Sequence, residues 1–250
     1  MARLTSTLDR LFDAALALVY PQGCAACGVC SVERRADWPA CARCWDSTRL
    51  FKGDETLCWK CGVPAGGEVP DEIKPTIRCR RCNAEEFTAA RACGLYEGAL
   101  RAAVLGLKRE PFVPPRFARM LREAARRAPL DAATLVVSVP LHPERERERG
   151  FNQATLLASA VAKGAHLRLD TWSLARVAHS ERHRAGMDAR ARRESVEAAF
   201  AVTRPRLVRG ESVLLVDDVF TTGATVSACA RVLLDAGARA VFVLTAARAV

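Results

Sequence analysis

Two adjacent carboxylates, Asp217 and Asp218, follow a run of four apolar residues at positions 213–216. Such a run is long enough for a strand that is buried on both faces, as in a parallel sheet. Residues 226–236 then carry apolar side chains at helical spacing, so the turn that precedes them is a helix N-terminus. The residues of this turn are Thr221, Thr222, Gly223, Ala224 and Thr225. Its N–H groups and positive dipole end suit a phosphate, and the carboxylates suit sugar hydroxyls or Mg²⁺.

The combination of these features is more specific than its parts. A strand that ends in Asp and leads into a Thr-capped helix occurs in many α/β proteins, and for Asp218 alone this structural explanation is favoured. The run is not a Walker loop, because no Gly-Lys-Ser/Thr follows, and it lacks two of the three glycines of the dinucleotide fingerprint. As a whole it closely resembles the phosphoribosyl diphosphate (PRPP) signature of type I phosphoribosyltransferases.

Four Cys-x-x-Cys pairs occupy the N-terminal third of the chain, and each can close a tight turn that aims two thiolates at one ion. The cysteines of these pairs are Cys24, Cys27, Cys41, Cys44, Cys58, Cys61, Cys79 and Cys82. A glycine follows the first pair of each half, which indicates an internal repeat. We predict two tandem zinc ribbons, one holding Zn²⁺ through the first four cysteines and the other through the last four. Sites with four thiolates are closed, so the predicted role is structural.

Several alternatives for the cysteines stay open. Crossed pairing would join the first pair to the third and the second to the fourth. Cys30 could replace Cys27 in the first site, since it continues the same spacing. An iron–sulfur cluster or a redox dithiol is a further alternative to zinc.

The composition is that of a globular protein, with 50% hydrophobic residues among 250. The net charge of +10 and the pI near 9.4 favour anionic partners, either nucleic acid or a phosphate-rich small molecule. Residues 1–20 lack a secretory pattern and fit a short amphipathic helix. Because no run of about 20 apolar residues occurs, we expect no membrane insertion and a cytoplasmic location, where paired cysteines more often bind metal.

The elements that position these residues follow from the apolar pattern, which changes near residue 88. We predict a cysteine-rich domain at 1–88 and a larger domain at 89–250. In the larger domain we predict strands at 90–96, 135–139, 213–216 and 241–244, and helices at 99–107, 116–127, 154–162 and 226–236. This alternation indicates a parallel sheet. Residues 176–193 are strongly basic with little periodic apolar content, so we predict a mobile segment there.

Four features match, in the same order, the ComF family of competence-associated, phosphoribosyltransferase-like proteins over nearly the full length. They are the cysteine pairs, Val139-Pro140-Leu141-His142-Pro143 before Arg149-Gly150-Phe151-Asn152-Gln153, the basic segment and the run 215–225. The chain departs from the family pattern in the basic segment, at Ser180, His183 and Ser195. The resemblance implies an α/β fold: a type I phosphoribosyltransferase-like parallel sheet flanked by helices, with an N-terminal double zinc ribbon.

The resemblance also implies PRPP binding with Mg²⁺ and assigns roles by motif. Asp217 and Asp218 would hold the ribose 2′ and 3′ hydroxyls, and the turn 221–225 would cradle the 5′-phosphate. The turn at Leu141 and His142 would contact pyrophosphate. His142 lies close to two prolines, Pro140 and Pro143, and is equally compatible with a structural role.

Several cations are candidates for neutralising the phosphates. Arg149 is the main candidate for the departing pyrophosphate and Arg145 and Arg147 are weaker ones, although the alternating charges at 144–149 also fit a solvated, self-paired surface. Lys108 either caps the preceding helix or reaches a phosphate. Asn152 and Gln153 fit first-turn positions of the next helix equally well.

Two classes of function remain in competition. The first is an enzyme, a Mg²⁺-dependent phosphoribosyltransferase that acts on an unknown acceptor and is linked through its family to DNA uptake in natural transformation. The second is a non-catalytic module of the same fold, which either handles single-stranded DNA with competence proteins or senses PRPP. The basic charge and the cysteine pairs motivate the second class.

Overall fold

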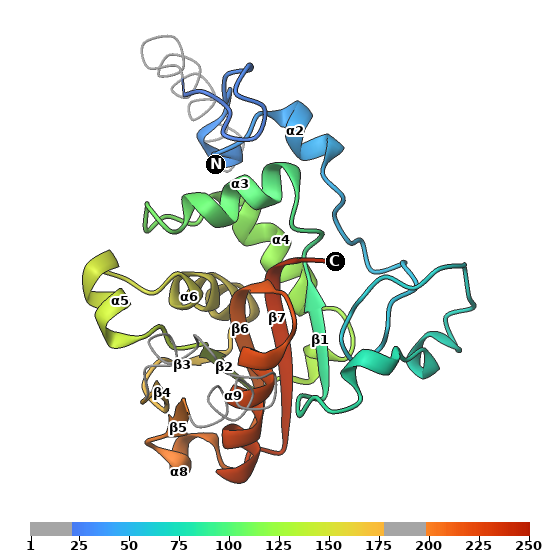
Figure 1. The fold of residues 1–250 in the computed structure, drawn as a ribbon, viewed down its shortest axis with the longest axis vertical. Coiled ribbons are helices and arrows are strands. Elements are labelled where there is room, and N and C mark those ends of the chain that lie inside the picture. Colours follow the sequence, from blue (N-terminus) through green and yellow to red (C-terminus); the bar gives the residue numbers. More distant parts are fainter. Residues whose placement is uncertain (1–21, 178–198) are drawn as a thin grey trace, which may run out of the picture.

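The computed structural model describes residues 22–177 and 199–250. Its centre is a sheet of five parallel strands in the order β1-β7-β6-β2-β3 (Figure 1). The strands are β1 (Ala89–Ala92), β2 (Leu135–Ser138), β3 (Arg168–Asp170), β6 (Ser212–Phe220) and β7 (Ala240–Arg248). The prediction of an α/β fold with a parallel sheet is therefore confirmed.

The two longest strands, β6 and β7, lie at the centre of the sheet and are apolar on both faces. Val213 and Leu215 belong to one hydrophobic cluster, whereas Leu214 and Val216 belong to another. Because successive side chains of a strand point to opposite faces, the two clusters are the two sides of the sheet. The carboxyl ends of neighbouring strands meet at one edge, and the loops of that edge are where ligands bind in open α/β sheets.

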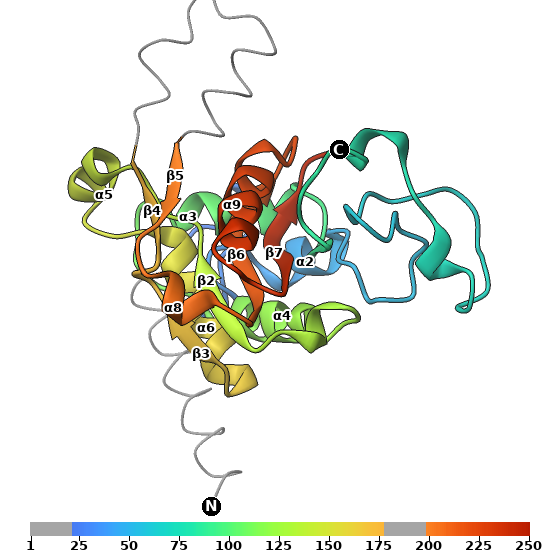
Figure 2. The ribbon, with the colours of Figure 1, turned by 90° about the horizontal axis from the view of Figure 1, so that it is seen from below.

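Helices cover both faces. Figure 2 shows α4 (Pro115–Ala125) and α6 (Gln153–Ala165) on one side of the sheet and α9 (Ala224–Asp235) on the other. Buried residues of α3 (Gly98–Gly106) belong to the same cluster as those of α4 and α6. These helices lie within one to three residues of their predicted bounds. Among the described residues, no helix combines the length and the hydrophobicity needed to cross a membrane.

Three predicted strands differ in length: β1 ends four residues before the predicted 96, and β6 and β7 end four residues beyond the predicted 216 and 244. The apolar pattern predicts that the strand at 213–216 ends at Val216, but β6 continues through both aspartates to Phe220. The reason is pairing: β7 runs alongside it to Arg248, with Asp217 opposite Thr245 and Phe220 opposite Arg248. The aspartates are therefore held by the sheet itself and not by a loop.

A small antiparallel sheet of β4 (Leu174–Arg176) and β5 (Phe200–Val202) brackets most of the predicted basic segment. The greater part of that segment, residues 178–193, lies outside the described residues, as does the predicted helix in residues 1–20. A four-residue helix, α8 (Pro205–Val208), follows β5. The charged residues at 144–149 belong to a short helix, α5 (Pro143–Arg149).

The described cysteine-rich part, residues 22–88, has no β-strand; it contains α2 (Ala42–Ser47) and three short 3-10 helices. These are η1 (Arg35–Asp37), η2 (Lys74–Thr76) and η3 (Arg80–Cys82), while η4 (Leu130–Ala132) lies in the larger part. Cys24 shares a hydrophobic cluster with α3, α4 and α6, whereas Cys58 shares the other with α9. The domain boundary after residue 88 stays a prediction.

Candidate functional site

The carboxyl end of β6 presents two carboxylates to different sides of the sheet. Asp218 Oδ2 accepts a hydrogen bond from Gln153 Nε2 of α6 at 3.3 Å. Asp217 faces the opposite side, where its charge acts on Cys229 of α9. The backbone N–H of Asp218 donates to Asp217 Oδ1 at 2.8 Å. Both residues are partly buried.

The carboxyl of Asp217 holds its proton unusually tightly. Burial is the main cause, the negative charge of Asp218 adds to it, and together they raise the pKa of Asp217 to about 8. The N–H of Asp218 and the positive charge of Lys108 act in the opposite direction. Lys108 therefore lies within electrostatic reach of the acidic pair. Its side chain is exposed at the end of α3.

The turn between β6 and α9 has the conformation that an anion cradle needs. Gly223 is the N-cap of α9 with φ +89°, a left-handed value that favours glycine. A Cβ on Gly223 would lie 2.8 Å from Cζ of Phe220, so the turn packs tightly on that ring. Thr221 and Thr222 are exposed, and Thr222 Oγ1 accepts from the N–H of Ala224 at 3.4 Å. Ala224 and Thr225 form the first turn of the helix. The predicted phosphate residues thus lie together at one helix N-terminus.

A second turn, predicted for pyrophosphate, follows the neighbouring strand β2. Val139 N donates to Val216 O at 2.9 Å, which holds this turn beside the end of β6. His142 Nδ1 accepts from the N–H of Glu144 at 3.2 Å and thereby caps α5. The cap gives His142 a structural role, and the neighbouring Leu141 is partly exposed at the same edge.

A chain of side-chain contacts joins Arg149 to the acidic pair. Arg149 Nη1 donates to Gln153 Oε1, and Gln153 Nε2 in turn donates to Asp218. Asn152 is the N-cap of α6: its Oδ1 accepts from the N–H of Ala154 at 2.9 Å. The structure therefore separates two residues that the sequence treats alike, because Asn152 caps the helix while Gln153 links an arginine to a site carboxylate.

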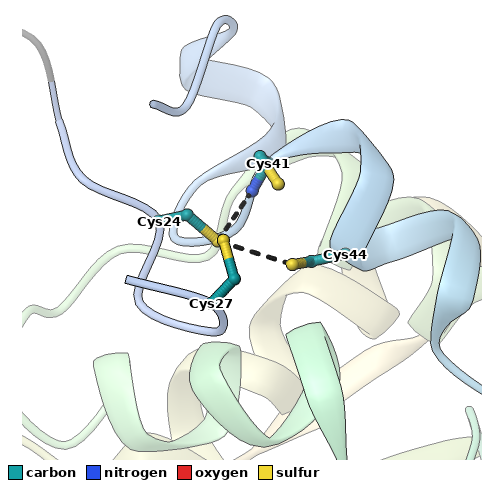
Figure 3. Close-up of side chains that lie close together, drawn as sticks. All are labelled: Cys24, Cys27, Cys41 and Cys44. Carbon is teal, nitrogen blue, oxygen red and sulfur yellow. Dashed lines mark hydrogen bonds between the residues drawn. The ribbon is translucent and has the colours of Figure 1, made fainter. Parts of the chain in front are cut away.

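The first cysteine group consists of Cys24, Cys27, Cys41 and Cys44, whose sulfurs all lie within 4.8 Å of one another (Figure 3). The first pair lies in a turn closed by the Gly23–Ser31 bridge, and the second pair lies at the N-terminus of α2. Cys24 Sγ accepts from the N–H of Cys41 at 3.2 Å. The N–H of Cys30 is the main cause that lowers the pKa of the Cys27 thiol to about 6. Cys30 therefore donates to the group through its backbone, and its own thiol lies outside it.

The second cysteine group repeats this arrangement with Cys58, Cys61, Cys79 and Cys82. Cys58 Sγ accepts from the N–H of Cys79 at 3.2 Å, and the second pair again starts a helix, η3. Burial raises the pKa of the Cys58 thiol, but N–H donors from Cys61 and Cys79 outweigh it and bring the pKa to about 6. The grouping is first pair with second and third with fourth, as the internal repeat predicts.

The geometry of both groups fits a metal ion. Four sulfurs at about 2.3 Å from one Zn²⁺ in a tetrahedron stand about 3.8 Å apart. The sulfurs of Cys24 and Cys44 are 3.7 Å apart, and those of Cys58 and Cys82 are 3.6 Å apart. Each group could therefore hold one metal ion, and a set of four thiolates is typical of zinc.

Two buried arginines lie beside the second group, and the sequence did not lead us to predict them. Arg248 Nη2 lies 3.8 Å from Cys61 Sγ, and Nη1 donates to Cys61 O. Arg91 stacks over the ring of Trp59 at 4.7 Å, and burial lowers the pKa of its guanidinium to about 10. The available signal was a charge inside an apolar strand, since Arg91 is flanked by alanines and Arg248 ends β7.

Comparisons with known proteins relate this chain to a domain family and to named relatives. Residues 150–249 match the family model of the phosphoribosyl transferase domain. The DNA utilization protein YhgH of Escherichia coli strain K12 is 32% identical over 213 residues, which cover 82% of this chain and 88% of that protein. Competence protein ComFC of Bacillus subtilis strain 168 is 34% identical over 110 residues, 43% of this chain and 41% of that one. Among solved structures, the glutamine PRPP amidotransferase from B. subtilis complexed with ADP and GMP matches 52% of this chain and 25% of its own, at 20% identity and a TM-score of 0.37.

Proposed function

This chain belongs to the ComF family of phosphoribosyltransferase-like proteins, and from this premise we propose that it binds PRPP with Mg²⁺ and transfers the phosphoribosyl group to an acceptor. One observation carries the proposal. The acidic pair Asp217–Asp218 is fixed in the central strand, and the turn that follows it begins α9 with Gly223 as the N-cap. Carboxylates beside a helix N-terminus supply both halves of a ribose 5-phosphate site.

The proposed roles follow from position. Asp217 and Asp218 accept hydrogen bonds from the ribose hydroxyls, and Thr221, Thr222 and the N–H groups of residues 223–225 bind the 5′-phosphate. Leu141 and His142 contribute the turn at the pyrophosphate. Bound Mg²⁺ would neutralise pyrophosphate oxygens, and no dedicated protein cage is needed for it.

The proposed reaction exchanges one bond at the anomeric carbon for another. The bond to the pyrophosphate oxygen breaks with its electron pair, and the acceptor nucleophile forms the new bond and loses a proton. Positive charge on the ribose and added negative charge on pyrophosphate therefore develop together. Arg149 and Lys108 supply fixed positive charge for the leaving group. Gln153 holds Arg149 and Asp218 in one hydrogen-bonded chain.

For the two cysteine groups we propose Zn²⁺ with a structural role. Four thiolates fill the tetrahedral positions of the ion, so no position stays open for chemistry. The proposed zinc would hold residues 22–88 in place, because that region has few regular elements of its own.

Titration of PRPP with Mg²⁺ into the zinc-loaded protein in a calorimeter tests the proposed function. Wild type is expected to bind, and Asp217→Ala and Asp218→Ala are expected to lose at least about 2 kcal/mol of binding free energy. Asp235→Ala, which removes an exposed acid at the end of α9, is the matched control and should bind normally. Wild-type protein that fails to bind PRPP with Mg²⁺ would overturn the proposal.

A second candidate is a binding module for single-stranded DNA, or a PRPP sensor without turnover, in a cytoplasmic DNA-uptake system. The net charge of +10 and the names of the relatives favour it. Affinity for single-stranded DNA that falls steeply with salt would support phosphate contacts. Pyrophosphate release that depends on an added acceptor would instead decide for the enzyme.

A further inference from the structure

Arg248 ends β7 with a guanidinium that points into the second cysteine group. The residue is 8% exposed. Its Nη1 donates to Cys61 O, and its Nη2 donates to Cys61 Sγ at 3.8 Å. Among the described residues, these are all the hydrogen bonds of the side chain, and its Nε has none. The polar contacts of this buried cation therefore go to one cysteine of the second group.

The same guanidinium lies over the ring of Phe220, with Cζ 4.4 Å from the ring centroid. Phe220 ends β6, is 4% exposed, and meets the ring of Phe87 edge to face at 5.9 Å. Its Cζ would be 2.8 Å from a Cβ on Gly223, so the ring packs directly against the turn 221–225, which is proposed to bind the 5′-phosphate and is called the phosphate turn below. A continuous line of contacts therefore runs from Cys61 through Arg248 and Phe220 to Gly223.

A second connection joins the same two regions. The residues that follow Cys82 lead directly to the start of α9: the N–H of Glu86 donates to Ser227 Oγ at 2.9 Å. Glu85 Oε2 would lie 3.4 Å from a Cβ on Gly223. The phosphate turn is thus supported both by the cysteine-rich segment itself and by Arg248.

From these contacts we propose that the second cysteine group, when it holds its metal ion, organises the phosphate turn, with Arg248 as the positioning residue between them. The inference rests on the proposed function, since it concerns how the 5′-phosphate of a ribose is held. An ion fixes Cys61 relative to Cys79 and Cys82, and Arg248 and Phe87 then fix Phe220 under Gly223. Pyrophosphate, which binds at the turn after β2, does not depend on this line of contacts.

Charge supports the same connection. One divalent ion with four thiolates carries a net charge of −2, and the second group is flanked by two buried guanidiniums, Arg91 and Arg248. A buried charge is stable only where it is paired. Arg248 therefore keeps its position over Phe220 only while the sulfurs of the second group stay together.

The test compares two ligands on the zinc-loaded full chain. Calorimetry measures ribose 5-phosphate, which needs the phosphate turn, and Mg²⁺-pyrophosphate, which does not. Arg248→Gln is expected to weaken ribose 5-phosphate about tenfold and to change pyrophosphate less than about twofold. A purely structural role would weaken both ligands together, and equal weakening would overturn the proposal.

Two further variants and one treatment sharpen the result. Arg248→Lys keeps a cation over Phe220 and is expected to stay within about threefold of wild type for ribose 5-phosphate. Arg116→Gln removes the arginine that stacks on Trp45 at 5.2 Å beside the first group, and it should change neither ligand. Because the first ion is expected to leave first, chelation of both ions from wild type should reproduce the Arg248→Gln pattern, whereas loss of the first ion alone should change neither ligand.

The outcomes separate the two proposals. Wild type that binds neither PRPP, ribose 5-phosphate nor pyrophosphate defeats the proposed function and this inference with it. Two results would contradict the role of Arg248 alone, provided that wild type binds both ligands. One is an Arg248→Gln variant that binds both ligands as well as wild type does. The other is an Arg248→Lys variant that binds ribose 5-phosphate as weakly as Arg248→Gln does.

Discussion

The two cysteine groups have the same local construction. In each, an N–H from the second pair donates to the first sulfur at 3.2 Å, Cys41 to Cys24 and Cys79 to Cys58. In each, the glycine after the first pair donates to the carbonyl of the first cysteine at 2.8 Å. The internal repeat is therefore a repeat of hydrogen bonds as well as of spacing.

Their surroundings differ. In the first group Cys27 is exposed, and the group packs beside α3 and α4 on one side of the sheet. In the second group only Cys79 is partly exposed, and Arg91 and Arg248 lie buried beside it. The same motif can therefore have two roles. The first group lies at the periphery of the molecule, whereas the second contacts residues that support the candidate site.

Removal of one cysteine ligand from each group is the strongest test of this difference between the two groups. Cys58→Ser leaves a buried site with three thiolates and is expected to cost on the order of 4 kcal/mol or more of unfolding free energy, together with one zinc per chain. Cys27→Ser, at an exposed position, should also lose one zinc but cost about half as much. Urea unfolding with metal analysis of each variant measures both quantities. Equal stability losses would show that the two groups are embedded alike.

The glycines that follow the first pairs give a matched test without touching a ligand. Gly28 and Gly62 have nearly the same φ, +69° and +71°. A Cβ on Gly62 would lie 2.5 Å from the backbone oxygen of Ala90, whereas a Cβ on Gly28 meets nothing within 4 Å. Gly28→Ala is therefore expected to cost about 1 kcal/mol, and Gly62→Ala about 3 kcal/mol, because only the second adds a backbone clash to the strain. Chemical denaturation of both variants decides, and similar values would contradict the close docking of the second group on β1.

The first group should also release its metal ion faster than the second group. The first group has an exposed cysteine and no buried arginine among its described neighbours, so it should open more easily. A difference of about 1.4 kcal/mol in opening free energy gives about tenfold faster transfer of the first ion to a chromophoric chelator. Wild type should show two phases, and Cys27→Ser should lack the fast one. A single phase in wild type would contradict the prediction that the two groups release their ions at different rates.

Much of this could be predicted from the sequence, because it depends on local pattern. The strand at 213–216, the helix after it and the pairing of the cysteines follow from periodicity and spacing. The continuation of β6 through Asp217 and Asp218 could not be predicted, because it depends on a partner strand that is distant in sequence. Residue propensity reflects only the local segment, whereas strand pairing also depends on a partner strand that is distant in sequence.

The contacts that distinguish the two cysteine groups were beyond the sequence for the same reason. Cys61 and Arg248 are 187 positions apart, and Gln153 and Asp218 are 65 apart. An arginine at the end of an apolar strand signals a buried partner but does not name it. Only the fold shows that this partner is a cysteine and that the ring beneath it supports the phosphate turn.

The last expected effect concerns Asp217, which faces the side of the sheet that holds the second group. An Asp in an unfolded chain has a pKa of about 3.9, whereas burial and Asp218 raise the pKa of Asp217 to about 8. Between these values the unfolded chain has released a proton that the folded chain retains, so the stability of wild type falls as the pH rises through this window.

Asn carries no charge to bury, so Asp217→Asn should match the stability of wild type below about pH 4 and exceed it by a margin that grows as the pH rises toward about 8. The same variant is expected to lose PRPP binding, because stability given up at a functional carboxylate is recovered when the function is removed. Thermal or urea unfolding of the two proteins at pH values on either side of the window measures the gain. A gain that does not grow with pH would mean that Asp217 is ionised and solvated in the free protein, and that the buried side of the sheet ends before it.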